Sequence, residues 1–155
     1  MHRNCVAVDA VLERAGVPGR VRILADPAPT AVAAAEQIGV QVGAIANSLV
    51  FATAEGEPVL VLTSGAHRVD TAKVAALLGT AKLNRADPEF VHTHTGQRIG
   101  GVAPVGHPAQ LRTLVDVALA EFPEVWAAGG IPHAVFPASY DELVLLTAGE
   151  PAQVS

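Results

Sequence analysis

Two apolar runs in the middle of the chain decide its fold. They read AIANSLVFAT at residues 44–53 and PVLVLT at residues 58–63. Both are rich in aliphatic and β-branched residues, and the polar turn AEGE at residues 54–57 separates them. Two such runs joined by a short polar turn predict a β-hairpin. We therefore expect a sheet at the centre of the fold.

Helix-start and helix-stop signals surround this hairpin. Thr30, Asp70 and Asp87 can each cap a helix, and Ser139 with Glu142 forms a capping box. The predicted helices cover residues 2–15, 31–38, 71–78, 88–93 and 140–146, with a short helical turn at 118–122. Further strands are predicted at 21–24, 111–117, 125–128 and 134–136, and one brief strand within the loop 96–108. The pattern indicates one α+β domain over residues 1–155, with a mixed or antiparallel sheet in its middle.

Composition excludes several classes of protein. The chain has 155 residues, of which 50% are hydrophobic and 16% are charged, which argues against intrinsic disorder. It contains no apolar run of about 18 residues, so we expect no membrane span. The single Cys5 cannot form an intramolecular disulfide. The first residues lack the apolar segment of a signal peptide, which predicts a cytoplasmic protein.

The net charge of −5 points away from an autonomous nucleic-acid binder. A local basic patch within an acidic whole stays open, although solvated faces are the usual explanation for scattered cations. The basic residues concentrated in and after the middle of the chain are Arg68, Lys73, Lys82, Arg85, Arg98 and Arg112.

Asn47 and Ser48 interrupt an otherwise apolar strand. Because successive side chains of a strand point to opposite faces, one of the two is expected to face a cleft or the core. The alternative interpretation is that these are ordinary polar residues of a strand whose side chains are hydrogen-bonded within the protein. The chain has none of the generic nucleophile-elbow, phosphate-loop, dinucleotide or zinc-protease motifs that would decide between these readings.

Two glycine pairs offer further candidate sites. In Gly100-Gly101-Val102-Ala103-Pro104, the backbone can approach a ligand closely and present amide donors, or can simply form a tight loop. In the second stretch, GGIPH at residues 129–133, His133 can donate to a ligand, act as an acid–base group or be structural. His92 and His94 have no carboxylate or cysteine beside them, so we expect neither a metal site nor a cofactor.

Taken in order, these stretches resemble the YbaK-like family, the editing domains associated with prolyl-tRNA synthetase. The resemblance covers about residues 30–147. The matching stretches are AIANSLVF (44–51), PVLVL (58–62), HRVDTAK (67–73), ADP (86–88), GGVAPVG (100–106), EVWAAGG (124–130) and HAVF (133–136).

This resemblance implies a fold and an activity. The fold would be a single α+β domain with a central mixed, barrel-like sheet flanked by helices. The activity would be hydrolysis of the ester between a wrongly attached small amino acid and the 3′ end of a tRNA, without metal or cofactor. Asn47 and Gly101 would be catalytic. The substrate-binding residues would be Ser48, Gly100, Val102, Pro104, Gly130 and His133.

One position departs from the family pattern, which has lysine where this chain has Asn47. Either another cation, such as Arg68 or Arg98, replaces the lost charge, or the activity is altered or absent. From the resemblance we expect a trans-acting aminoacyl-tRNA deacylase that acts on a mischarged small amino acid, with proline tRNA as the favoured carrier. The alternative is a non-catalytic module that binds an aminoacyl group, a tRNA or a synthetase. The acidic balance predicts weak, salt-sensitive binding to the tRNA acceptor end, with a synthetase as a possible partner.

Overall fold

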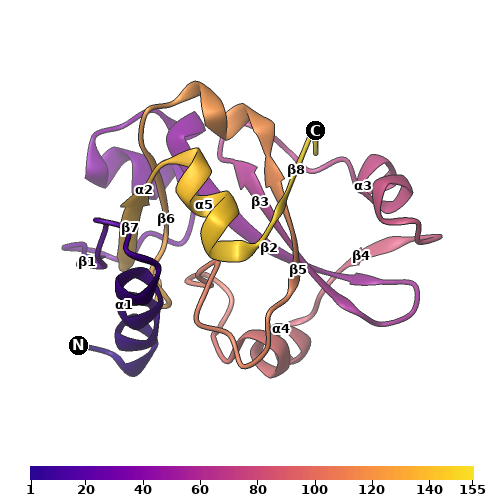
Figure 1. Cartoon of the computed structure of the whole chain (residues 1–155), viewed down its shortest axis with the longest axis horizontal. Coiled ribbons are helices and arrows are strands. Elements are labelled where there is room, and N and C mark those ends of the chain that lie inside the picture. Colours follow the sequence, from indigo (N-terminus) through magenta and orange to yellow (C-terminus); the bar gives the residue numbers. More distant parts are fainter.

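The computed structural model describes residues 1–155 of the chain. Figure 1 shows its elements in chain order. The helices are α1 (Arg3–Ala15), α2 (Ala31–Ile38), α3 (Thr71–Leu78), α4 (Pro88–Thr95) and α5 (Tyr140–Thr147), with short 3₁₀ turns η1 (Val42–Ala44) and η2 (Val117–Glu121). The strands are β1 (Arg22–Ile23), β2 (Ile45–Thr53), β3 (Pro58–Ser64), β4 (Leu83–Arg85), β5 (Arg112–Asp116), β6 (Val125–Ala128), β7 (Ala134–Ala138) and β8 (Glu150–Ala152).

The predicted helix starts are confirmed by their caps. The side chains of Thr30, Asp70, Asp87 and Ser139 each accept a hydrogen bond from the backbone N–H three residues later. At α5 the Glu142 carboxylate also accepts from the Ser139 amide at 2.8 Å, which completes the predicted capping box. Helix α4 continues to Thr95, beyond its predicted end, because Gly96 is the residue that adopts the left-handed terminating conformation.

The predicted hairpin is the centre of a mixed sheet. Strands β2 and β3 pair antiparallel from Ala46↔Ser64 to Ala52↔Pro58, whereas β3 and β5 pair parallel. The strand order is β1-β7-β6-β2-β3-β5-β8, and β4 pairs with β2 outside this path. The expected mixed sheet flanked by helices is confirmed, and the path does not close, because β1 and β8 remain its end strands.

Three details differ from the predicted elements. Strands β4 and β8 were not predicted, since each has only three residues and is largely exposed, so neither carries a strong apolar signal. The brief strand expected within residues 96–108 is absent. Side chains, rather than a neighbouring strand, bond the backbone groups of that loop.

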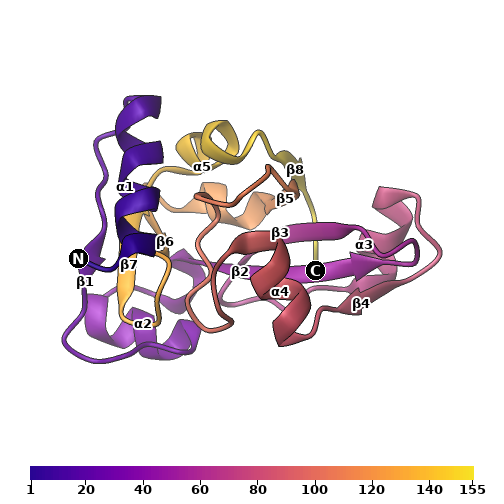
Figure 2. The same ribbon diagram turned by 90° about the horizontal axis from the view of Figure 1, so that it is seen from below.

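Helices cover both faces of the sheet (Figure 2). On one face, α1, α4, α5 and the loop after α4 pack on the main core, which includes Leu12, Leu62 and Leu143. On the other face, α3 packs around Phe51, while α2 packs around Trp126. None of the helices combines the length and the apolar character needed to cross a bilayer. Strand β2 contributes to all three clusters, so its two faces border different parts of the interior.

Candidate active site

Strand β2 is unpaired along part of one edge. This edge pairs with β6 only at Ile45 and Ala46, and with β4 only from Phe51 to Thr53. Alternate residues of a strand direct their N–H and C=O groups to opposite edges. The Val50 carbonyl accepts from an amide outside β3 at 3.3 Å, so it points away from β3. Ser48 lies two residues before Val50, and its backbone N–H and C=O therefore point to the same open edge. The gap thus exposes backbone hydrogen-bonding groups in the middle of the sheet.

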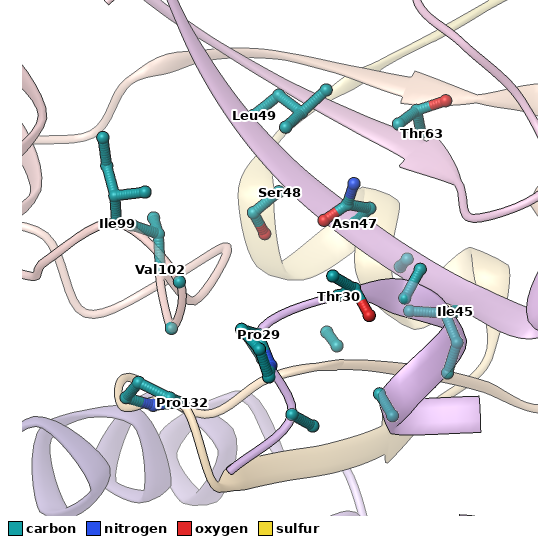
Figure 3. Close-up of a pocket in the computed structure, with 18 of the residues that line it drawn as sticks. Pro29, Thr30, Ile45, Asn47, Ser48, Leu49, Thr63, Ile99, Val102 and Pro132 are labelled. Carbon is teal, nitrogen blue, oxygen red and sulfur yellow. The ribbon is translucent and has the colours of Figure 1, made fainter. Parts of the chain in front are cut away.

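A cavity of about 680 Å³ lies at this gap. Its walls come from β2, from the loop before α2, from the glycine loop after α4 (residues 99–105) and from the β6–β7 loop. Figure 3 shows Pro29 and Thr30, Ile99 and Val102, and Pro132 around the open space beside β2. Segments far apart in the sequence therefore build one site.

Two polar side-chain atoms in the cavity wall are buried without a hydrogen-bond partner. They are the Ser48 hydroxyl and the Trp126 indole nitrogen. Figure 3 shows the Ser48 side chain directed toward the space between Pro29 and Val102. Most buried polar groups in proteins are hydrogen-bonded, so such atoms in a cavity wall mark where a ligand can bind.

The glycine loop packs tightly against the β6–β7 loop. A Cβ atom on Gly101 would overlap the Ile131 carbonyl carbon and lie 2.7 Å from the Pro132 nitrogen. The Gly101 amide donates to the Arg98 carbonyl at 3.3 Å, whereas the amides of Gly100 and Val102 have no partner within the protein. Gly101 thus permits the close approach, and its two neighbours provide the free donors.

Two side chains hold this loop in place from behind. Buried Gln97 accepts from the Ala103 amide at 2.7 Å and donates to the Val105 carbonyl at 3.2 Å. His107 Nε2 lies 2.7 Å from the Ala103 carbonyl. Burial lowers the pKa of His107, and the hydrogen bond to Ala103 opposes that shift only in part. The neutral ring therefore donates from Nε2 to the loop.

The charged residues in the cavity wall are all basic. Arg68 and Arg85 line it, and no aspartate or glutamate does. Neither guanidinium takes part in the two ion pairs of the structure, which are His67–Asp116 and Arg112–Glu150. An acidic protein thus presents a locally positive cavity, which suits an anionic ligand.

His67 also lines the cavity, and a buried carboxylate holds it. Its Nδ1 lies 3.1 Å from Oδ2 of Asp116, which is 1% exposed. The same oxygen accepts from the Ser64 amide at 3.0 Å and lies 3.4 Å from the Thr63 hydroxyl. Thr63 stands opposite Asn47 in the β2–β3 ladder, so this polar cluster adjoins the Asn47 side of the cavity.

The structure brings most of the predicted site residues together. Those that line the cavity are Asn47, Ser48, Gly100, Gly101 and Val102. Of the two cations considered as substitutes for the family lysine, Arg68 lines the cavity and Arg98 does not.

The other predicted residues lie outside the cavity wall. Pro104 is buried within the glycine loop and does not line the cavity. The Gly130 carbonyl accepts from the Asn4 side chain at 3.1 Å, so this glycine serves the contact with α1. The His133 backbone carbonyl accepts from the Leu24 amide, and its neighbours Ile131 and Pro132 are the residues of this loop that line the cavity.

Some residues of the site carried no signal in the sequence. Gln97 and Asp116 look like ordinary polar residues, and only their burial reveals their contacts. In the sequence, Arg85 is one cation among several. No group of three or more His, Cys, Asp or Glu side chains is arranged to hold a metal ion.

Comparison with known proteins places the chain in a family. The aminoacyl-tRNA editing domain matches residues 25–146. The uncharacterized protein YwhH of Bacillus subtilis (strain 168) is 33% identical over 110 residues, which are 71% of this chain and 69% of that protein.

The names of two further relatives refer to prolyl-tRNA synthetase. A crystal structure described as a candidate trans-editing enzyme for prolyl tRNA synthetase superimposes with a TM-score of 0.93 at 40% identity, covering 100% of this chain and 98% of that one. The proline–tRNA ligase of Nitratidesulfovibrio vulgaris (strain DP4) is 35% identical over 82 residues, which are 53% of this chain and 14% of the ligase. With the family match spanning most of its length, this chain belongs to the aminoacyl-tRNA editing domain family.

Proposed function

We propose that the protein is a trans-acting aminoacyl-tRNA deacylase, which hydrolyses the ester of a mischarged small amino acid on tRNA. The observation that carries this proposal is the cluster of unpartnered hydrogen-bonding groups in the cavity of an editing-domain protein. These groups are the Ser48 hydroxyl and the amides of Gly100 and Val102. The relatives named for prolyl-tRNA synthetase favour proline tRNA as the carrier and that synthetase as a partner. Action on tRNA fits a cytoplasmic location.

The free amides suit the chemistry of ester hydrolysis. Attack on the ester carbonyl places negative charge on its oxygen, and backbone amides aimed at that oxygen stabilise the tetrahedral intermediate. Removal of one such donor in other hydrolases costs about 10²–10³-fold in rate. We assign this role to Gly100 and Val102, with Gly101 allowing the loop to approach.

The cavity wall beside Ser48 is built from small side chains. Ala46 of β2 and Ala127 of β6 line it together with Val102. Such a wall leaves room for an aminoacyl group next to the Ser48 hydroxyl. One methylene changes binding by only about 1–3 kcal/mol in an apolar pocket, so selectivity among small amino acids would be modest.

Arg68 and Arg85 supply positive charge in place of the lysine that Asn47 replaces. Both are unpaired and line the cavity, so a phosphate of the tRNA 3′ end can bind between or beside them. Each phosphate contact removed should lower the salt dependence of tRNA binding by about one unit of slope. We expect this change for Arg68→Gln and Arg85→Gln. The control Arg112→Gln should leave the slope unchanged, because Arg112 pairs with Glu150 outside the cavity.

The direct test is a deacylation assay with purified protein. A panel of tRNAs charged with alanine, cysteine, serine or proline is incubated with and without the protein, and the remaining ester is measured. We expect at least one mischarged proline tRNA to lose its amino acid faster than in buffer. If none of the panel is hydrolysed above the buffer rate, the proposed activity is wrong.

Asn47→Lys separates an active editor from a disabled one. A fall in hydrolysis on this substitution would show that Asn47 belongs to a working site adapted to the neutral side chain. A large rise from a near-zero wild-type rate would show a binding module that has lost the activity. The same variant should be compared with the wild type in tRNA binding, so that a gain in affinity is not mistaken for a gain in catalysis.

A further inference from the structure

Asp116 is a buried carboxylate placed at the end of β5. Three donors surround its Oδ2 atom: the Ser64 amide at 3.0 Å, the His67 ring at 3.1 Å and the Thr63 hydroxyl at 3.4 Å. The Ala118 amide donates to Oδ1 at 3.0 Å. Both oxygens are thus engaged, and the carboxylate has a fixed orientation.

This carboxylate determines how the His67 ring lies. Since a carboxylate oxygen accepts hydrogen bonds, Nδ1 of His67 is the nitrogen that donates, and in the neutral ring this leaves the lone pair on Nε2. The backbone is also held, because the His67 amide donates to the Ser64 carbonyl at 2.9 Å. His67 lines the cavity, and its side chain is 36% exposed. The ring is thus held by a buried carboxylate and is still accessible to a ligand and to water.

We propose that His67 is the general base of the hydrolysis, with Asp116 as its positioning residue. This inference rests on the proposed deacylase function. A histidine hydrogen-bonded to a buried carboxylate and open to a cavity is the arrangement by which many hydrolases activate a nucleophile. Here the nucleophile is water, because no serine or cysteine hydrogen-bonds to the ring.

Nε2 of His67 takes a proton from water while the water oxygen bonds to the ester carbonyl carbon. The tetrahedral intermediate then breaks its bond to the ribose oxygen, which takes the proton back from Nε2. The products are the free amino acid and a tRNA with an intact 3′-terminal hydroxyl, and His67 returns to its starting state.

The groups around His67 favour this role. Asp116 is the carboxylate in contact with it, while the nearby cavity cations are Arg68 on the same loop and Arg85 on β4. Tyr140 of α5 lies close enough to Asp116 to be influenced by it; burial, then Asp141 and Asp116, raise its pKa, so the phenol stays neutral. The cavity wall holds no carboxylate that could take over as base.

The test compares kcat/KM for deacylation between the wild type and His67→Asn over a range of pH. Asparagine retains an N–H donor where Nδ1 stood, so the bond to Asp116 survives, but it has no counterpart of Nε2. We expect a loss of about 10²–10⁴-fold. The wild-type rate should fall in acid, as protonation removes the Nε2 lone pair, and this acid limb should vanish from the residual rate of the variant.

His67→Gln is the second variant, and His92→Asn is the matched control. His92 is an exposed histidine of α4 that does not line the cavity, so its replacement should change neither the rate nor the profile. Thermal unfolding shows whether each variant is folded. A near-wild-type rate in both His67 variants overturns the inference, as does a loss of rate that keeps the acid limb. An inactive wild type instead overturns the proposed function, and this inference with it.

Discussion

The two walls of the cavity are built in different ways. On one side, β2 is tied to β3 by a continuous backbone ladder from residues 46–52 to residues 58–64. On the other side, the glycine loop has no regular secondary structure and depends on the side chains of Gln97 and His107. Many equivalent backbone hydrogen bonds stabilise the first wall, whereas the side chains of a few residues stabilise the second. Single substitutions should therefore disturb the loop wall more than the strand wall.

The largest effect is expected from Gly101→Ala in the loop wall. The added Cβ would overlap the backbone of Ile131 and Pro132, so the loop must move away. Overpacking of this kind costs about 1–3 kcal/mol of stability. A displacement near 1 Å can reduce catalysis by about 100-fold. Deacylation rates and urea unfolding measure the two losses.

The matched control is Gly56→Ala in the hairpin turn of the strand wall. Its Cβ meets nothing within 4 Å, and the cost is only that of a left-handed conformation, with φ at +81°. We expect a loss of about 1 kcal/mol in stability and no change in deacylation. Equal losses of activity in the two variants would contradict the distinction between the walls.

Gln97→Ala should be the next most damaging change. It leaves the Ala103 amide and the Val105 carbonyl without their buried partner, which costs about 1–3 kcal/mol. Hydrogen exchange should show faster opening of residues 99–105 than in the wild type. Gln41→Ala is the control, because Gln41 is exposed and its side chain makes no capping hydrogen bond, so its loss should stay within about 0.5 kcal/mol. Unchanged exchange in the Gln97 variant would show that the loop does not depend on this residue.

Ser48→Ala tests the strand wall itself. The hydroxyl has no partner in the free protein, so we expect the stability to stay the same or rise slightly. If the substrate binds this hydroxyl, kcat/KM should fall about tenfold. Ser139→Ala should show the opposite signature, a loss of about 1 kcal/mol from the α5 cap with normal activity. A Ser48→Ala variant with wild-type kcat/KM would show that the substrate does not bind this hydroxyl.

The smallest effect concerns the pH dependence of the loop wall. Burial lowers the pKa of His107 in the folded state below its ordinary value of 6.5, so the unfolded chain binds the proton more readily. This contribution to stability is complete above pH 6.5 and is lost as the pH falls toward the folded-state pKa. His107→Gln should lose less stability than the wild type between pH 7.5 and 5.5 in urea unfolding. An equal loss in both proteins would show that other groups cause the acid sensitivity.

The same contrast explains which parts of the fold were predictable. The hairpin and the capped helices depend on neighbours in the chain, so patterns such as Asp70 before α3 predicted them correctly. Strand β8 depends on a distant partner, β5, and the glycine loop depends on the side chains of Gln97 and His107 and on its close contact with the β6–β7 loop. The residue types of both segments resemble those of an ordinary loop. The site was predictable to the same extent: Asn47 and Ser48 stood out as polar residues in an apolar strand, whereas Gln97 and Asp116 did not stand out at all.

The sequence by itself determined the local elements, the acidic balance and the order of motifs that resembles an editing domain. Only the tertiary structure decided that β2 has an open edge at Ser48, that Arg68 and Arg85 share one cavity, and that Asp116 holds His67. The physical reason is that propensity and capping act over a few residues, whereas these contacts join segments brought together by the core. His67 and Asp116, for example, are 49 positions apart and meet because β3 and β5 pair side by side.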